Sequence, residues 1–317
     1  MDISEHRLPQ DGRSRVGYMG KEIDLRLSVI PSIYGESVVI RLLDTEFALN
    51  SLEELGFSDQ DAVALRHLLS QTNGLFLVTG PTGSGKSTTL YTALNHIKKT
   101  NVNIITVEDP VEYHMDRVTQ IQTNEHTGYT FAKALRHILR HDPDVIMVGE
   151  IRDQETAKMA IESALTGHLV LSTLHTNSAA STVTRLLEIG VEPYLVTSTL
   201  LGVLAQRLVR CNCPHCLEQE PVDSSIRELL GASDDDAFYK GKGCVRCHNT
   251  GVHGRRAVYE LLSVTQEIRT LTKPGVSSLL LQQQAIKGGM TPLTEQALTL
   301  AKQKIISLSE VYRVRLS

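Results

Sequence analysis

The sequence predicts an α/β fold built on a parallel β-sheet, and three observations support this prediction. Four short apolar runs occur in the middle of the chain, and segments with helical periodicity separate them. A glycine-rich loop directly follows the first run. Strands that alternate with helices form parallel sheets whose two faces are covered by those helices. The runs are Leu75–Val78, Ile104–Val107, Val145–Val148 and Leu169–Leu171.

Composition sets the broad class of protein. The chain has 317 residues, of which 41% are hydrophobic and 21% charged, as in a folded globular protein. The formal net charge of -4 gives no general basic field for nucleic acid or an anionic membrane. Residues 1–11 are polar, unlike a signal peptide, and no apolar run is long enough to cross a membrane. We therefore expect a cytoplasmic protein.

The chain divides into four predicted parts. Residues 1–47 alternate polar and apolar side chains around Ile23–Val29 and Val38–Ile40, so they read as a small β-rich part. So few strands make a marginal core, and we expect a remnant of a larger domain. Residues 51–208 form the α/β core, opening with a helix capped by Ser58.

The pattern changes after the fourth apolar run. It breaks after Gln206 into a cysteine-bearing loop region, residues 209–260, and residues 261–317 read as a small helical part. The predicted helices of the core and of the C-terminal part are Thr88–Lys98, Phe131–Leu139, Thr156–Leu165, Ser277–Ile286 and Pro292–Lys304.

The glycine-rich loop matches the pattern G-x-x-x-x-G-K-[ST] between a strand and a helix. Such a loop folds its backbone N–H groups around the phosphates of a nucleotide, and the helix N-terminus adds a favourable dipole. We expect Lys86 to reach the β and γ phosphates of ATP and Ser87 to bind Mg²⁺. An ordinary glycine turn is the alternative. The predicted nucleotide-binding residues are Gly80, Pro81, Thr82, Gly83, Ser84, Gly85, Lys86, Ser87 and Thr88.

Acidic residues follow two of the predicted core strands. Glu150 comes after Val145–Val148, which we expect beside the phosphate-loop strand, and it is the predicted catalytic base. Glu108 begins the acidic segment Glu108–Glu112 and is the first choice for supporting magnesium or positioning the nucleophile. A solvated turn is the alternative for this segment.

Other polar residues lie around the same strands. His168 and His175 bracket the fourth apolar run, and His175 lies at the carboxyl end, where ligands bind in open α/β sheets. It is the better candidate for sensing the γ phosphate. Arg152, two residues after Glu150, is a candidate for the same site, with a salt bridge to Asp153 or a neighbouring helix as the alternative.

Five cysteines gather in one region. Cys213 and Cys216 form one C-x-x-C pair, and Cys244 and Cys247 form a second. Two such pairs supply four thiolates for one tetrahedral zinc ion. We expect structural zinc there, because all four positions of the metal would be filled. Reduced free thiols are the alternative, and Cys211 is the extra residue that competes as a ligand.

Four ordered motifs resemble those of the secretion ATPase family. Gly80–Ser87 resembles its Walker A motif, Ile105–Pro110 its Asp box, Gly149–Asp153 its Walker B motif, and Thr166–Asn177 its His box. The resemblance implies a RecA-like core and a homohexamer. It also implies that ATP hydrolysis moves an inner-membrane platform protein, so that a type II secretion pseudopilus or a type IV pilus is assembled. Peripheral association with that membrane is expected.

The resemblance extends to the N-terminal residues. Residues 9–13 look like the middle of the family's second N-terminal domain, which implies that the preceding partner-docking domain lies outside this sequence. Arg26 and Arg41 match arginines that family members present toward the nucleotide. Tetracysteine insertions mark assembly and secretion members, so retraction of a pilus is disfavoured.

Two other classes of function remain open. RecA-like cores also drive nucleic-acid motors, but the acidic pI of about 6.3 argues against nucleic acid as a partner. Lack of stimulation of the ATPase activity by nucleic acid would separate the two functions. A module in which ATP only switches conformation is the second alternative, and steady-state phosphate release would exclude it.

Overall fold

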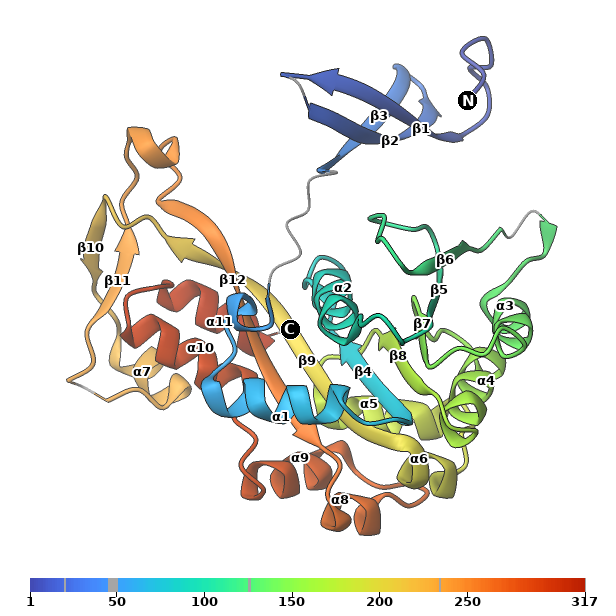
Figure 1. Cartoon of the computed structure of the whole chain (residues 1–317). Helices are drawn as coiled ribbons and strands as arrows, with labels where there is room; N and C mark the ends of the chain where they lie inside the picture. The colour runs from blue at the N-terminus through green and yellow to red at the C-terminus, as the bar shows by residue number, and fades with distance from the viewer. Residues whose placement is uncertain (20, 45–50, 125–126, 234, 317) are drawn as a thin grey trace. The chain divides into compact units, whose positions relative to one another are not determined.

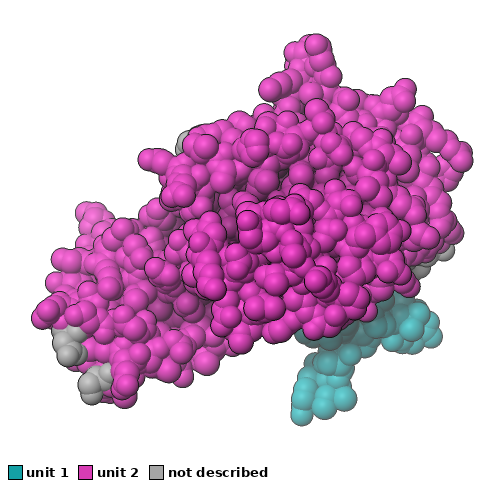
Figure 2. Space-filling view, turned by 90° about the horizontal axis from the view of Figure 1, so that it is seen from below, with its two compact units in different colours: residues 1–49, 112–115 teal, residues 50–111, 116–317 magenta. Residues whose placement is uncertain are grey.

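The computed structural model describes residues 1–19, 21–44, 51–124, 127–233 and 235–316. The chain forms two compact units (Figures 1 and 2). Unit 1 comprises Met1–Leu49 and Glu112–Met115, and unit 2 comprises Asn50–Val111 and Asp116–Ser317. The predicted boundary between residues 47 and 51 falls largely outside the described residues.

Unit 1 is a three-stranded antiparallel sheet in the order β1-β2-β3. β2 (Lys21–Ser32) and β3 (Gly35–Asp44) contain the two predicted strands and are joined at the predicted turn. β1 (Gln10–Tyr18) was not predicted from the sequence, because its arginines, glycines and serine give no apolar alternation. The β-rich character expected of this part is therefore confirmed.

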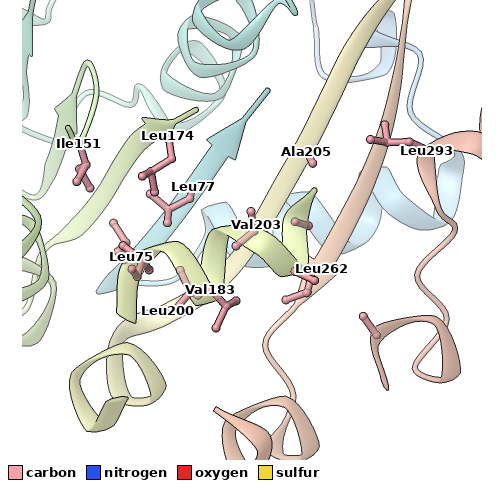
Figure 3. Packing of buried hydrophobic residues seen from close by; sticks show 14 of the residues in the cluster. Leu75, Leu77, Ile151, Leu174, Val183, Leu200, Val203, Ala205, Leu262 and Leu293 are labelled. Carbon is pink, nitrogen blue, oxygen red and sulfur yellow. The ribbon is translucent and has the colours of Figure 1, made fainter. Parts of the chain in front are cut away.

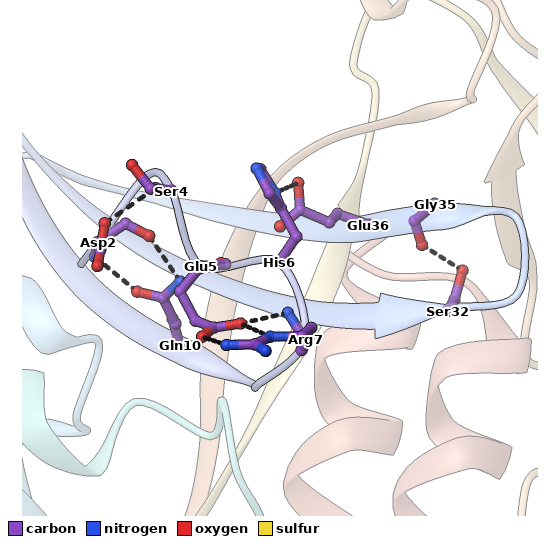
Figure 4. A network of polar contacts seen from close by, with 9 residues as sticks. All are labelled: Asp2, Ser4, Glu5, His6, Arg7, Gln10, Ser32, Gly35 and Glu36. Atoms are coloured by element: carbon purple, nitrogen blue, oxygen red, sulfur yellow. Dashed lines mark hydrogen bonds and ion pairs between the residues drawn. The ribbon is translucent and has the colours of Figure 1, made fainter.

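Polar contacts fix the residues before β1 to the start of that strand (Figure 4). The Gln10 side chain donates to the carbonyl oxygens of Asp2 and Glu5, at 2.8 and 2.7 Å. It also accepts from the backbone N–H of Asp2 at 2.7 Å. Arg7 donates to Glu5 with 2.7 Å between Nη2 and Oε2. One amide side chain thus closes the N-terminal turn.

Unit 2 contains a seven-stranded sheet in the order β12-β9-β4-β8-β7-β5-β6. β12 is antiparallel to β9, and every other neighbouring pair is parallel. A separate antiparallel pair, β10 with β11, lies in the cysteine-bearing region. The strands are β4 (Gly74–Thr79), β5 (Ile104–Glu108), β6 (Thr119–Gln122), β7 (Val145–Val148), β8 (Leu169–Leu174), β9 (Leu200–Asn212), β10 (Leu217–Glu220), β11 (Phe238–Gly241) and β12 (Val252–Ser263).

Helices cover the sheet and form the C-terminal part (Figure 1). The six predicted helices, including the one capped by Ser58, are confirmed, with ends that differ by a few residues. The helices are α1 (Asp59–Leu69), α2 (Lys86–Ile97), α3 (Phe131–Ile138), α4 (Gln154–Leu165), α5 (Ala179–Glu188), α6 (Pro193–Thr199), α7 (Ser224–Leu230), α8 (Gln266–Leu271), α9 (Ser278–Lys287), α10 (Leu293–Lys302) and α11 (Leu308–Leu316).

The central strand β4 is buried along its whole length. Leu75 and Leu77 belong to a large apolar cluster with Val183 of α5 and Val203 of β9 (Figure 3). Phe76 alternates with them and therefore points to the opposite face, against which α2 packs. Burial on both faces explains the continuous apolar run in the sequence.

Two predictions about the sheet were wrong. β9 continues to Asn212, so the chain does not break into a loop region after Gln206. Polar and apolar residues alternate irregularly in this segment, and its backbone hydrogen bonds come from pairing with β12. Because β12 is antiparallel to β9, the sheet is mixed. β7 is not beside β4, since β8 lies between them. The predicted α/β class with a mainly parallel sheet is confirmed.

Glu260 of β12 connects the sheet to two helices. Its buried carboxylate accepts from the backbone N–H of Ala179, the first residue of α5, at 2.7 Å. It also accepts from the N–H of Leu293, the first residue of α10, at 3.3 Å. Burial raises the pKa of Glu260, although these two donors and the charge of Arg207 oppose the shift. One side chain therefore satisfies donors at two helix N-termini.

None of the helices in the described part of the chain has both the length and the apolar character needed to span a bilayer.

We predict that Glu260→Gln lowers the free energy of unfolding by roughly 1–2 kcal/mol at pH 5, because an amide group cannot accept from both helix N-termini. The deficit should shrink as the pH rises above the ordinary Glu value of 4.5, since only the parent then ionises a carboxyl whose pKa is raised in the folded state. Urea unfolding at several pH values measures this difference. Glu218→Gln, at an exposed position on β10, is the control. A deficit that grows with pH would contradict the assignment.

Candidate functional site

The glycine-rich loop connects β4 to α2 at the carboxyl edge of the sheet. Gly80, Gly83 and Gly85 have φ values of +146°, +78° and +91°, which side chains rarely adopt. A Cβ atom on Gly80 would lie 2.4 Å from the carbonyl oxygen of Gln206. The sequence pattern is therefore explained by backbone conformation and by the close approach of β9.

Lys86 begins α2 and points back along the loop. Its Nζ atom donates to the carbonyl oxygens of Gly80 and Pro81, at 2.8 and 3.1 Å. Burial lowers the pKa of Lys86, the charge of Glu150 opposes this effect, and the charge of Arg207 adds to it. The ammonium group thus lies within reach of the loop and in the field of Glu150.

Gln206 of β9 holds the loop from the side and was not predicted as a site residue. Its Nε2 atom donates to the carbonyl oxygen of Ser84 at 2.7 Å, and its Oε1 atom accepts from Thr89 at 2.8 Å. Gln206 is 2% exposed. One amide therefore fixes the loop relative to the first turn of α2. The signal that could have found it is a glutamine in an otherwise apolar run.

Glu150 follows β7 and lies between two predicted site residues. Arg152 Nη2 is 2.5 Å from Glu150 Oε1, and His175 Nε2 is 3.3 Å from Glu150 Oε2. The Glu150 side chain is 15% exposed, whereas those of Arg152 and His175 are about half exposed. Sequence reasoning selected all three, and the structure brings them together.

Hydrogen bonds from β8 hold the Glu150 segment and the His175 segment in place. Thr173 Oγ1 donates to the Gly149 carbonyl at 2.7 Å, and the N–H of Ile151 donates to the Thr173 carbonyl at 2.9 Å. At the end of β4, Thr79 Oγ1 accepts from the N–H of Thr176 at 2.9 Å. The residue after His175 is thereby tied to the residue before the phosphate loop.

Glu108, at the end of β5, lies in a buried polar network. Its Oε2 atom accepts from the Tyr91 hydroxyl at 2.5 Å. Its Oε1 atom accepts from Thr106 at 2.6 Å and from Gln120 at 3.2 Å. The carboxylate therefore connects α2, β5 and β6. Its expected role at magnesium stays a prediction.

Arg26 and Arg41 lie on unit 1, and their role as nucleotide ligands stays a prediction. They are directly opposite each other on β2 and β3, and Arg13 of β1 is opposite Arg26 on the other side. Paired residues project from the same face, so three arginines form a row. Sequence reasoning missed Arg13 because β1 was not recognised. Arg26 Nη2 also lies 2.8 Å from Glu112 Oε2, within the same unit.

His168 lies at the amino end of β8. Its Nδ1 atom is 2.9 Å from the carbonyl oxygen of Ser163 and 3.2 Å from the Thr166 hydroxyl. These are local contacts at the end of α4, and a role of His168 in sensing the γ phosphate stays a prediction.

The four cysteines of the C-x-x-C pairs converge, and their sulfur atoms lie within 4.8 Å of one another. The Sγ atoms of Cys213 and Cys244 are 3.9 Å apart, as are those of Cys216 and Cys247. Tetrahedral zinc with Zn–S bonds of about 2.3 Å needs sulfurs separated by about 3.8 Å. The cysteine pairs with measured distances thus match the spacing of a tetrahedral metal site, and Cys211 lies outside the cluster.

Backbone geometry supports this cluster. Cys247 Sγ accepts from the N–H groups of Cys244 and Gly251, at 3.1 and 3.3 Å. The N–H of Cys213 donates to the Gly251 carbonyl at 2.9 Å, which joins the ends of β9 and β12 beside the cluster. Such N–H donors favour thiolate over thiol.

Comparison with known proteins identifies the relatives of the chain. It is 48% identical to the type IV pilus assembly ATPase PilB of Thermus thermophilus over 315 residues, which are 98% of the chain and 35% of PilB. It is 45% identical to the type II secretion system ATPase E of Vibrio cholerae over 99% of the chain and 63% of that protein. The chain therefore spans about one to two thirds of these relatives.

Solved structures agree with the fold. The pilus retraction motor PilT with bound ADP superposes with a TM-score of 0.70 and 31% identity, over 97% of the chain and 78% of PilT. The ATPase DotB of Legionella pneumophila has a TM-score of 0.72 at 23% identity, over 97% of the chain and 77% of DotB, which supports the fold alone. Residues 1–313 match the family described as Type II/IV secretion system protein. The chain therefore belongs to the Type II/IV secretion system protein family.

Proposed function

We propose that the chain binds Mg-ATP at Gly80–Ser87 and hydrolyses its terminal phosphate, so that it works as a motor in type II secretion or type IV pilus assembly. The observation that carries the proposal is the convergence of Lys86, Glu150 and His175 at the carboxyl edge of one sheet. The bound ADP of PilT, a relative with 31% identity, supports the choice of nucleotide.

Before a nucleotide binds, two backbone carbonyl groups of the loop accept hydrogen bonds from Lys86. Nζ of Lys86 contacts the oxygens of Gly80 and Pro81. A triphosphate carries full negative charge, so it competes with these neutral oxygens for the ammonium group. Backbone N–H groups of the loop and the α2 N-terminus then bind the remaining phosphate oxygens. Lys86 therefore stabilises the bound ground state as well as the transition state.

Glu150 is the proposed general base. Arg152 and His175 each lie against one of its carboxylate oxygens. Since a phosphoryl group attracts the guanidinium group more strongly than a single carboxylate, Arg152 leaves Oε1 when the nucleotide binds. Oε1 then accepts the proton of the attacking water, and Arg152 stabilises charge on the transferred group. His175 holds the second oxygen and orients the carboxylate.

The loop and nearby acids would hold magnesium. The Ser87 hydroxyl follows Lys86 and is exposed, so it is available to the ion. Glu108 accepts three hydrogen bonds from Tyr91, Thr106 and Gln120, which favours support through a water molecule over direct contact. Glu150 is therefore preferred to Glu108 as the general base.

Assembly completes the proposed motor. Arg26 and Arg41 of unit 1 supply positive charge to a bound nucleotide, in a ring of six copies. The ring acts on a platform protein at the inner membrane. Names of the relatives support assembly or secretion, since they include a pilus assembly ATPase and type II secretion ATPases. The tetracysteine cluster binds structural zinc.

The zinc assignment predicts one zinc ion per chain after purification under reducing conditions without chelator. Cys213→Ser and Cys244→Ser should each lose the ion and lower the thermal unfolding temperature, because three thiolates hold zinc less tightly. Elemental analysis provides the measurement. Cys211→Ser, outside the cluster, should retain the ion. A zinc-free parent protein that is unaffected by either substitution would refute this assignment.

Gln206→Leu should weaken binding of Mg-ATP by about tenfold, because the loop loses two buried hydrogen bonds that hold it in the binding conformation. Isothermal titration calorimetry measures the dissociation constant. Gln219→Leu on the exposed strand β10 is the matched control. Unchanged affinity in Gln206→Leu would show that the loop is organised without this side chain.

Two substitutions separate binding from chemistry. Lys86→Ala should lose ATP affinity by about tenfold or more, because it removes a charge-assisted contact made in the ground state. Glu150→Gln should keep ATP bound and lose about 10²-fold in turnover, because the amide cannot accept a proton. Phosphate release and equilibrium binding provide the two measurements.

Glu155→Gln, an exposed neighbour on α4, is the control for Glu150→Gln and should retain the parental turnover. If Glu150→Gln hydrolyses ATP at the parental rate, Glu150 is not the base. Glu108→Gln would then be the next variant to test.

A further inference from the structure

Arg207 is a buried charged residue beside the site that the mechanism above does not use. It lies on β9 next to Gln206 and is 5% exposed. Since side chains alternate along a strand, Arg207 lies on the same face as Val203, which packs in the apolar cluster with α5 (Figure 3). Gln206 points to the opposite face, where it holds the phosphate loop. Two adjacent residues of β9 therefore act on the two faces of the sheet.

The guanidinium group of Arg207 donates to backbone carbonyl groups of two separate parts of the chain. Nη2 donates to the carbonyl oxygen of Asn177 at 2.9 Å, and Nη1 donates to that of Gln206 at 3.1 Å. Asn177 lies two residues after His175. The Gln206 carbonyl adjoins the phosphate loop, because it would be 2.4 Å from a Cβ atom on Gly80. Arg207 thus connects the chain after β8 to the strand beside the loop.

The position of His175 depends on backbone contacts. The His175 segment, residues 175–178, joins β8 to α5, and His175 itself is exposed. An exposed side chain has little packing around it, so contacts to the backbone of its segment decide where the imidazole lies. Thr79 accepts from the N–H of Thr176, and Arg207 supplies a charged donor one residue further on. A hydrogen bond from a charged donor is stronger than one between neutral groups.

We infer that Arg207 is a positioning residue for hydrolysis, because its hold on the Asn177 carbonyl keeps His175 against Glu150. The inference rests on the proposed function, in which His175 orients the carboxylate of the base. His175 Nε2 lies 3.3 Å from Glu150 Oε2, so a shift of the segment by about 1 Å would break this contact. Arg207 acts through the backbone and through His175, and it touches no reacting atom.

Two neighbouring charges determine which substitutions of Arg207 are informative. Burial lowers the pKa of Arg207, and the charge of Glu260 opposes this effect. The charge of Arg207 also contributes to the lowered pKa of Lys86, of which burial is the main cause. Loss of the charge would therefore leave buried Glu260 less compensated and would change the field at the phosphate loop. A test of position alone needs a variant that retains the charge.

Arg207→Lys retains the charge and replaces the planar fork by one ammonium group, which does not hold both carbonyl groups in the same geometry. This variant should lower kcat by about threefold or more, while the dissociation constant of Mg-ATP changes by less than about twofold. Phosphate release at saturating Mg-ATP and calorimetric titration provide the two measurements.

Arg210→Lys is the matched control and should retain the parental kcat. Arg210 lies on the same strand, three residues further along, and its Nη2 atom is 2.8 Å from Oε1 of Glu310, a buried carboxylate of α11. The control therefore makes the same substitution in an arginine that also pairs with a buried glutamate.

A double-mutant cycle with His175→Ala tests the route by which Arg207 acts. Arg207→Met removes both hydrogen bonds and should lower kcat by about tenfold in the parent protein. In the His175→Ala protein it should lower kcat by less than about twofold, because the group that Arg207 positions is already absent. Thermal unfolding shows whether each protein is folded at the assay temperature. If Arg207→Met is not, Arg207→Lys takes its place in the cycle and should lower kcat only where His175 is present.

The outcomes distinguish the inference from the proposed function. Equal losses of kcat with and without His175, or a loss of ATP affinity in Arg207→Lys as large as its loss of kcat, would show that Arg207 does not act through His175. ATP hydrolysis at the proposed site would survive either result. If His175→Ala retains the parental kcat, the inference is likewise overturned. If the parent protein hydrolyses no ATP, the proposed function fails and the inference fails with it.

Discussion

The site depends on the pairing of β4 with β8 on one edge and β9 on the other. Both neighbours are parallel to β4 at this point, so the carboxyl end of β8 and the middle of β9 lie beside the phosphate loop. His175 directly follows β8, and Gln206 lies on β9. Residues from three distant parts of the sequence therefore reach one loop because of strand order.

β8 also explains how Glu150 reaches the site although β7 is not next to β4. Thr173 of β8 holds the Gly149–Ile151 segment through two hydrogen bonds, and Thr79 of β4 holds the segment after His175. The segments that carry Glu150 and His175 are thus fixed to their neighbours through backbone atoms. The side chains of Arg152 and His175 are about half exposed, whereas that of Glu150 is 15% exposed.

The conformation of the glycine-rich loop and the cysteine cluster could be predicted from the sequence, because each pattern has a local cause. Glycine occurs at positions 80, 83 and 85 because the backbone there has positive φ values. The C-x-x-C spacing predicts two turns that each direct two cysteines toward one metal ion. Long-range features were not predicted. Gln206 acts on the loop through strand pairing, and β12 joins β9 from about fifty residues further along the chain. The buried network around Glu108 likewise depends on Tyr91 and Gln120, which no local pattern connects.

We expect Lys86 to exchange the loop carbonyls for phosphate oxygens when ATP binds. A crystal structure with magnesium and a non-hydrolysable ATP analogue is the decisive measurement. Nζ should move away from the oxygens of Gly80 and Pro81, which lie at 2.8 and 3.1 Å, and should contact the β and γ phosphates. A structure in which the analogue is bound while Nζ remains on both carbonyls would show that Lys86 does not make this exchange.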